Sequence, residues 1–452
     1  MIDISFVILL VWLTSVLLLK TIVKGNSNVV ILVITWWFLW LYISTYSFGG
    51  IDTPTDNTYL YFLTVLISVT IGSVSFIFVK NKTIARFSSE NWNDKRDYKI
   101  NNIVNFLIKI NYFIIFPSML YFLFKALYLI LTIDSIGLFR SMAMGSGDET
   151  SKIFSNLLLQ YYYSWFVMPI VMVSMFVGIS SYISKLESKL LIISFVGLLM
   201  SSLISLGRGQ IFMFLILYVI VIIYQNSFKI LAILRSKSII KALSILLLII
   251  LITFARTEGN IDFKSLFNIF VINYHTCGFA IFNDELMDPV SYLNTHTTYG
   301  MASTGAVSYF TGIWYHLFDN SFHPIPEEVG RALNTYKNLG FNEDGIPLFY
   351  NAFGTVMYSI YLDGGLLFSI LLSFLYGFYI TKHIFLSKYK SNYSYYSLSL
   401  VFLFIYISFS GLFVPTLSGN VILYFIFLFI LFKTNLSTLI LNESTYKNHQ
   451  KV

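Results

Sequence analysis

The hydrophobic pattern of this chain consists of long apolar runs separated by short polar segments. A helix that crosses a bilayer needs roughly 20 mostly apolar residues. The runs that are candidates for such helices are Ile4–Leu19, Val29–Tyr46, Tyr59–Val79, Tyr112–Ile133, Leu157–Ile183, Leu190–Leu206, Ile211–Tyr224, Ile239–Phe254, Phe349–Ile380, Tyr395–Val414 and Leu417–Phe432. We therefore predict an all-α fold, a polytopic membrane helical bundle of about eleven transmembrane helices, which forms one integral membrane domain over residues 1–452. The first run has no basic leader, so we expect it to remain as a helix.

Charged residues between the runs set the predicted topology, because Lys and Arg accumulate in short cytoplasmic loops. Lys20 and Lys24 follow the first run, whereas Gly49–Asn57 carries Asp52 and Asp56 and no basic residue. When successive runs cross the membrane in turn, the other basic clusters fall on the same side as Lys20. They are Lys80 to Lys99, Lys185 and Lys189, Lys229 to Lys241, Lys382 to Lys390, and Lys447 with Lys451. Eleven crossings then place the N-terminus outside and the C-terminus inside.

The stretch 256–348, here called the outer segment, differs from the other connections in length and charge. It holds ten acidic residues against four basic ones, and four of the six histidines. The topology predicts that it forms a large extracytoplasmic (periplasmic) loop, and loops of this length are uncommon unless they are functional. Within it, Leu266–Phe282 has an interrupted apolar helical pattern, which indicates a helix lying at the membrane interface.

Composition agrees with a membrane protein and argues against several functions. The chain is 57% hydrophobic and 11% charged, against about 25% charged residues in soluble domains. The net charge of +7 does not indicate nucleic-acid binding, because the basic residues are concentrated in short loops. The single cysteine, Cys277, excludes an internal disulfide and a cysteine-based metal site. Because nucleotide-binding and zinc-protease motifs are absent from the sequence, we expect neither a cofactor nor a metal.

Two arginines are predicted at the outer face. Arg208 lies between two glycines in the middle of the apolar stretch Leu190–Tyr224, which is too long for one span and so predicts a tight turn. Arg256 directly follows the eighth run. Guanidinium groups hold phosphate oxygens bidentately, so the pair suggests an anionic ligand such as a lipid diphosphate. Alternatively, Arg208 snorkels to anchor a hairpin and Arg256 pairs with Glu258.

Polar residues within apolar runs form a second group of candidates, because ionisable groups at that depth are costly and often functional. Lys125 lies inside the fourth run and is either a headgroup contact or a snorkelling residue. Asp363 in the ninth run is either a general base toward a sugar hydroxyl or a structural partner of an arginine. Asn351 and Tyr358 precede it and can line the same wall.

Residues of the outer segment are weaker candidates. His275 and the other loop histidines lack metal-ligand spacing, so each is an acid, a base or a structural residue. Arg331 lies near Glu327 and Glu328 and either pairs with them or contacts the substrate. The aromatic residues of this segment favour an interfacial belt slightly over a platform for sugar rings; they are Tyr292, Tyr299, Tyr309, Trp314 and Tyr315.

With these residues in place, the chain resembles the Wzy-type oligosaccharide repeat-unit polymerases, the bacterial O-antigen and capsule polymerase family. The likeness rests on the helix count, the turn Ser205–Gln210, the late large loop opened by Arg256, and the segment from Asn351 to Gly365. It covers Leu190 to Phe432, and the N-terminal half by helix count only.

The resemblance implies a glycosyltransferase C-like fold and a reaction at the periplasmic face of the bacterial inner membrane. A sugar hydroxyl of one undecaprenyl-diphosphate-linked repeat unit attacks the anomeric carbon of a chain held on a second lipid. Arg208 and Arg256 would stabilise the departing diphosphate, and Asp363 would be the base. Lys125, Arg331, Asn351, Tyr358 and His275 would contact the substrate. A chain-length regulator and a flippase of the same pathway are the implied partners, together with membrane lipid.

Two other functions share some of these features. An O-antigen ligase has a similar topology, but the His-Asn motif usual in its large loop is replaced here by His275-Thr276, His296-Thr297 and His323-Pro324. A flippase or transporter tends to have two related halves and broken helices at the midplane. The charges of this chain cluster instead at its outer side, which favours an outward-facing enzyme.

Overall fold

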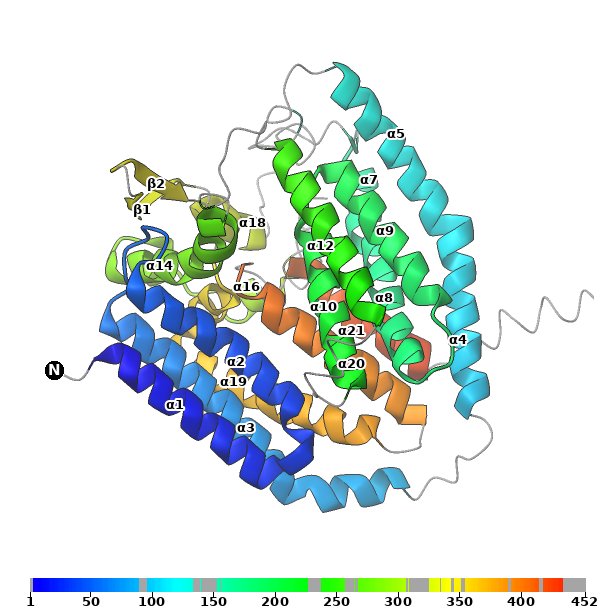
Figure 1. The fold of residues 1–452 in the computed structure, drawn as a ribbon, viewed down its shortest axis with the longest axis horizontal. Helices are drawn as coiled ribbons and strands as arrows, with labels where there is room; N and C mark the ends of the chain where they lie inside the picture. The colour runs from blue at the N-terminus through cyan, green and yellow to red at the C-terminus, as the bar shows by residue number, and fades with distance from the viewer. Residues whose placement is uncertain are drawn as a thin grey trace, which may run out of the picture. The chain divides into compact units, whose positions relative to one another are not determined.

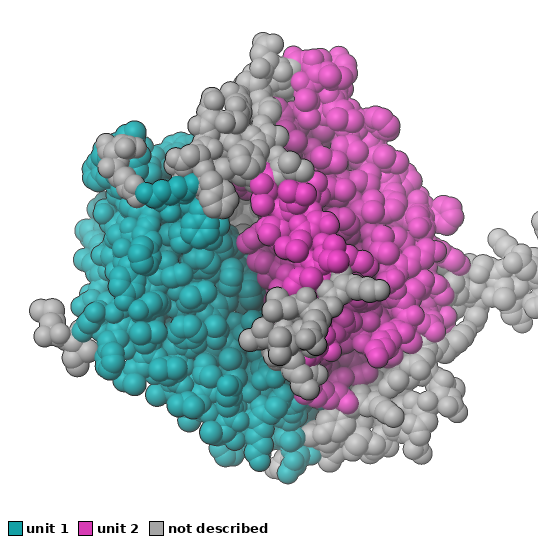
Figure 2. Space-filling model, in the orientation of Figure 1, with its two compact units in different colours: residues 1–90, 261–386, 407–422 teal, residues 91–260, 387–406, 423–452 magenta. Residues whose placement is uncertain are grey.

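A computed structural model shows a mostly helical protein (Figure 1). The residues that it describes are 3–88, 96–132, 139, 153–154, 156–226, 237–256, 264, 267–305, 308, 325–333, 335–342, 345–350, 354–388, 392–413 and 418–433. The chain divides into two compact units, coloured in Figure 2. Unit 1 contains Met1–Glu90, Ile261–Leu386 and Ile407–Ile422, and unit 2 contains Asn91–Asn260, Ser387–Tyr406 and Leu423–Val452. The single membrane domain stays a prediction.

Unit 1 is built around helices that the apolar runs predict. Its long helices are α1 (Ile4–Leu18), α2 (Asn28–Ile43), α3 (Asp56–Ser88), α14 (Tyr274–Met287) and α19 (Val356–Ser387). The carboxylate of Asp3 caps α1 by accepting from the Ser5 N–H at 2.9 Å, and this satisfies one of the free donors of a helix start. Helices α1, α2 and α3 pack against one another (Figure 1).

Helices α3 and α19 approach each other through two glycines. A Cβ at Gly72 would clash with the Phe374 carbonyl, and a Cβ at Gly377 would clash with the Val69 carbonyl. Ser73 on α3 donates a hydrogen bond from Oγ to the Gly377 carbonyl at 3.0 Å. Small residues at such a contact let two helix backbones meet closely, as in other membrane helix pairs. We call this contact the glycine seam.

The outer segment contains a small antiparallel sheet that the sequence did not predict. Strand β1 (Lys337–Phe341) pairs with β2 (Pro347–Tyr350). On its other side, β1 meets the loop before α3, because the Asp52 N–H donates to the Leu339 carbonyl at 2.7 Å. Both stretches were predicted to be extracytoplasmic, and their pairing places them on one side of the protein. The helix predicted from Phe349 therefore begins later, at Val356, because Phe349 belongs to β2.

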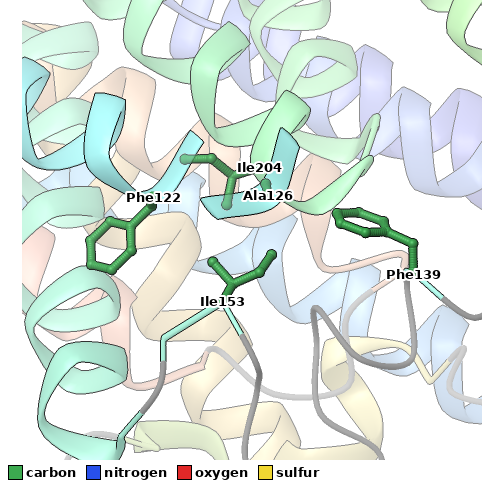
Figure 3. Close-up of a cluster of buried hydrophobic side chains, with 5 residues drawn as sticks. All are labelled: Phe122, Ala126, Phe139, Ile153 and Ile204. Atoms are coloured by element: carbon green, nitrogen blue, oxygen red, sulfur yellow. The ribbon is translucent and has the colours of Figure 1, made fainter. Parts of the chain in front are cut away.

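Unit 2 is a second group of packed helices. They are α4 (Arg96–Ile110), α5 (Phe116–Thr132), α7 (Leu157–Tyr162), α8 (Met168–Ile183), α9 (Lys189–Ser205), α10 (Gly209–Gln225) and α12 (Lys237–Arg256). Helices α20 (Asn392–Ser410) and α21 (Ser418–Lys433) contribute residues to both units. A buried apolar cluster, the Phe122 cluster, joins α5 to the end of α9 and consists of Phe122, Ala126, Phe139, Ile153 and Ile204 (Figure 3).

Among the residues that the structure describes, six helices are long and apolar enough to cross a membrane, which supports a membrane protein. They are Ile4–Asn26, Asn28–Tyr46, Asp56–Asn81, Ile100–Thr132, Leu158–Ile183 and Val356–Ser387. The remaining predicted spans correspond to shorter apolar helices: Lys189–Ser205, Gly209–Gln225, Ser238–Ile250, Ser394–Ser410 and Val421–Lys433. The count of about eleven crossings therefore stays a prediction. Helix α4 was not predicted, and it continues into α5 through a π-helical turn at Asn111–Ile115.

The glycine seam makes a prediction about stability. Gly377→Ala should lower the free energy of unfolding by about 1–3 kcal/mol, because the added methyl group forces apart two packed backbones. The measurement is thermal unfolding of the purified protein in detergent. Gly330→Ala is the matched control, because Gly330 is also helical and a Cβ there meets no atom within 4 Å. Equal unfolding temperatures for both variants would contradict the seam.

Candidate functional site

Asp363 connects helix α19 to the short helix α16 (Met301–Thr304). Its Oδ1 accepts hydrogen bonds from the Thr298 hydroxyl at 2.6 Å and from the Ala302 N–H at 2.9 Å. Its Oδ2 accepts one from the Ser303 N–H at 2.8 Å, and the residue is 3% exposed. A carboxylate that accepts from N–H groups in the first turn stabilises a helix start. Asp363 is therefore a clamp between the outer segment and α19, held by a hydroxyl and two backbone N–H groups and not through the predicted arginine partner. Its role as a general base stays a prediction.

Two glycines directly after the clamp interrupt helix α19. Gly365 has φ +66° and ψ −156°, a conformation in which residues with a Cβ are strained. Gly364 also departs from helical geometry, with ψ +27°. The break separates Val356–Asp363 from the longer part of α19 that forms the glycine seam. Tyr358 and Asp363 thus share one short helical piece.

Glu285 on α14 is the centre of a second buried polar cluster. Its Oε1 accepts from the Lys337 ammonium at 2.5 Å, and its Oε2 accepts from the Tyr358 hydroxyl at 3.1 Å. Lys337 also donates to Asp284 at 2.5 Å. Burial lowers the pKa of Lys337, but the hydrogen bonds and charges of Asp284 and Glu285 outweigh burial and raise it. Lys337 therefore stays charged, and the cluster ties α14, β1 and α19 together.

A tyrosine and a histidine stack in the loop that follows α14. The rings of Tyr292 and His296 are 4.2 Å apart between centroids, with 17° between their planes. The Tyr292 hydroxyl donates to Glu328 on α18 (Ile325–Leu333) at 3.1 Å. Burial, followed by the Glu328 charge, raises the pKa of Tyr292, so the phenol stays protonated. Arg331, a predicted substrate contact, is an exposed residue of the last turn of α18.

His275 is enclosed by aromatic rings and only 4% exposed. It stacks on Trp40 at 3.9 Å between centroids, and the edges of Trp36 and Phe413 meet it at 5.2 and 4.7 Å. Its Nδ1–H donates to the Val271 carbonyl at 2.5 Å. Burial lowers its pKa to about 4, with the Val271 bond opposing. The ring is a neutral core residue, and it is too enclosed for the predicted substrate contact.

The predicted turn at Arg208 is confirmed. Helix α9 ends at Ser205, and Leu206 takes the left-handed conformation with φ +47°. The Gly207 N–H then donates to the Ser202 carbonyl at 3.0 Å, which closes α9. Arg208, half-buried, is the N-cap residue of α10. A guanidinium at a helix start adds positive charge to the partly positive helix N-terminus, so an anion is favoured there.

Arg256 is expected at the same end of unit 2 as Arg208. It is the last residue of α12, which packs against α10, the helix that precedes it. We expect two consecutive packed helices to run antiparallel, so the end of α12 is level with the start of α10. Lys237 and Lys241 begin α12 at the opposite end. The side chain of Arg256 lies outside the described part of the structure.

Lys125 lies on α5 next to the Phe122 cluster, which packs against the end of α9 that precedes Arg208. Phe122 and Ala126, on either side of it along α5, pack with Ile204 near the end of α9. The ammonium of Lys125 lies 4.9 Å from the centre of the Tyr121 ring, a cation–π contact. Three basic residues predicted from the sequence, Lys125, Arg208 and Arg256, therefore share what we call the basic end of unit 2.

The structure thus sorts the predicted site into two groups. Tyr358 and Asp363 lie together in unit 1, and the basic end belongs to unit 2. Asn351 lies outside the described residues. Sequence reasoning missed Glu285 and Lys337; the polar run 283–285 that interrupts the apolar pattern of α14 was a signal for them.

One hollow opens on unit 1 beside the loop before α3. Its lining residues are Ile43, Ser44, Ser47, Phe48, Gly49, Ile51, Asp52, Pro54 and Thr276. In the part of the chain that the structure describes, no three His, Cys, Asp or Glu side chains are grouped to hold a metal ion.

The clamp makes a prediction about Asp363. Asp363→Ala should lower the free energy of unfolding by about 3 kcal/mol, because it leaves three buried donors without an acceptor. Asp363→Asn should cost less, since its amide oxygen still accepts. Thermal unfolding in detergent measures both, with Asp288→Ala as the control, because the exposed Asp288 accepts from one N–H only. An Asp363→Asn protein that is fully stable yet inactive would favour the general base instead.

Burial of His275 makes stability depend on pH. Its pKa falls from 6.5 in the unfolded chain to about 4 in the folded one, so the unfolded state binds the extra proton first on acidification. The stability present above pH 6.5 should be lost as the pH falls toward 4, by about 3 kcal/mol. Thermal unfolding from pH 7.5 to 4.5 measures this loss. His275→Phe should reduce the dependence, and His296→Gln, at an exposed histidine, should leave it unchanged.

Comparisons with known proteins do not identify a family for this chain. No protein-family model, no curated protein and no solved structure matches the chain. The likeness to the Wzy-type polymerases therefore rests on the residues and helix pattern of this chain alone.

Proposed function

We propose that the protein polymerises undecaprenyl-diphosphate-linked oligosaccharide repeat units at the outer face of the bacterial inner membrane. Six helices that are long and apolar enough to cross a bilayer support a membrane protein. In the proposal, the shorter apolar helices cross as well, and the N-terminus lies outside. Residues 207–209 and the outer segment then face the periplasm, where lipid-linked repeat units are presented.

The observation that carries the proposal is the basic end of unit 2. Arg208 begins α10 and Arg256 ends α12, whereas Lys237 and Lys241 lie at the opposite end of α12. Lys125 lies within α5, beside residues that pack against the end of α9. A basic residue on the cytoplasmic side needs no further explanation. Basic residues concentrated at the opposite end indicate an anionic ligand, and a lipid diphosphate is the anion that fits this depth.

The proposed reaction transfers a glycan between two lipids. A sugar hydroxyl of the acceptor attacks the anomeric carbon of the donor and loses its proton to a base. The new glycosidic C–O bond forms as the bond to the diphosphate oxygen breaks, and undecaprenyl diphosphate leaves with the electron pair. Arg208 and Arg256 stabilise the negative charge that develops on this leaving group. Cleavage of the activated donor bond supplies the driving force.

A genetic experiment tests the proposal. Deletion of the gene should remove the long ladder of surface glycan on a gel and leave single repeat units attached to their acceptor. Complementation with Arg208→Ala or Arg256→Ala should not restore the ladder, because loss of one charge-stabilising contact slows such reactions about 100- to 1000-fold. Lys241→Ala is the matched control: it removes an exposed basic residue at the other end of α12 and should restore the ladder.

Other outcomes would overturn the proposal. Loss of single repeat units together with the ladder would indicate a flippase or a ligase. An unchanged glycan profile in the deletion strain would exclude a role in surface-glycan assembly altogether. If both arginine variants restore the ladder at normal protein levels, the basic end of unit 2 is not required for the function.

A further inference from the structure

Tyr299 combines a strained backbone with an exposed ring. Its φ is +50°, in the left-handed region, and 85% of the residue is exposed. A residue other than glycine held in that region costs of order 1 kcal/mol or more. Packing of the ring against the rest of the protein does not compensate, because the residue is largely exposed. A glycine or asparagine would make the same turn with less strain, so the tyrosine side chain itself calls for an explanation.

The turn around Tyr299 is fixed from both sides. Before it, the Thr298 N–H donates to the Leu362 carbonyl at 3.1 Å, and the Thr298 hydroxyl donates to Asp363 at 2.6 Å. After it, the Met301 N–H returns to the Thr298 carbonyl at 3.0 Å. The Asp363 clamp then holds the next two N–H groups. The ring is therefore presented from a rigid support, which lowers the entropy lost when a ligand binds.

The neighbours of Tyr299 along the chain are polar. Asn294, Thr295, His296 and Thr297 are all exposed, and the His296 ring is supported by its stack on Tyr292. Residues 287–305 contain no Lys or Arg. An aromatic face next to neutral hydrogen-bonding groups matches a pyranose ring, which has an apolar C–H face and a rim of hydroxyls. A phosphate ligand would require basic residues here.

We propose that Tyr299 is a saccharide-stacking residue and that it forms, with the exposed residues 294–297 at and after the end of the short helix α15 (Tyr292–Thr295), a glycan subsite on the outer segment. The subsite takes one neutral sugar ring of the repeat unit, whose C–H face packs on the tyrosine. The choice of a repeat-unit sugar rests on the proposed function. This role accounts for the strain at Tyr299, for its exposure and for the hydrogen bonds that hold its turn.

Saturation-transfer difference NMR tests the subsite. The probe is an oligosaccharide of the host's own surface polymer, released by partial acid hydrolysis, and the protein is full-length in lipid nanodiscs. Tyr299→Asn should weaken binding about tenfold, as expected for the loss of one aromatic stack, while its unfolding temperature stays equal or rises because the strain is relieved. Tyr299→Trp should retain binding. Tyr336→Asn, which removes a tyrosine that is 68% exposed in the same unit, should have no effect.

The outcomes separate the subsite from the proposed function. Binding that is absent in the wild type, or unchanged in Tyr299→Asn, overturns the subsite whatever the gene deletion shows. If sugar binding depends on Tyr299 but deletion of the gene leaves the glycan ladder intact, the polymerase function is contradicted and the subsite is retained. Brominated lipids quench tryptophan fluorescence. If they quench Tyr299→Trp more than the wild type, residue 299 lies in the membrane as an anchor, and the subsite is overturned.

Discussion

Three hydrogen bonds to the Asp363 carboxylate hold the outer segment to helix α19, and much of unit 1 depends on them. Burying an ionised carboxylate is costly unless donors replace its water, and here Thr298, Ala302 and Ser303 supply them. The same short helical piece presents Tyr358 to Glu285. One piece of α19 thus positions α16, the turn at Tyr299 and the buried ion pair with Lys337. Gly364 and Gly365 then break the helix directly after Asp363, so the short helical piece ends at the clamp.

The two units offer different chemistry to a ligand. The described part of unit 1 that belongs to the outer segment combines acidic groups with exposed neutral side chains. The acidic groups are largely engaged by Lys337 and by tyrosine hydroxyls. Unit 2 carries Arg208 at the start of α10 and Arg256 at the end of α12, away from the lysines that begin α12. A lipid-linked glycan also has two chemically distinct parts, an anionic diphosphate and neutral sugars. In the proposed function, the diphosphate is held by unit 2 and a sugar by unit 1.

The sequence predicted the features that side-chain patterns encode. Apolar runs located the helices, and the glycines around Arg208 located the turn between α9 and α10. The strand β2 was missed because Phe349 and Tyr350 continue the apolar pattern of the helix behind them. The clamp was missed because two of its three donors are backbone N–H groups, which no side-chain pattern reveals. Glu285 and Lys337 were missed because their partnership joins residues far apart in the chain.

The glycine seam also has a consequence for how a lipid could enter. Two helices whose backbones touch at Gly72 and Gly377 leave no room between them for an acyl chain. The hydroxyl of Ser73 bonded to the facing backbone also opposes sliding of one helix past the other. Helices α3 and α19 therefore form a closed wall that moves as one body. Any lateral doorway for a polyprenyl tail must open along a different helix pair, where larger side chains can swing aside.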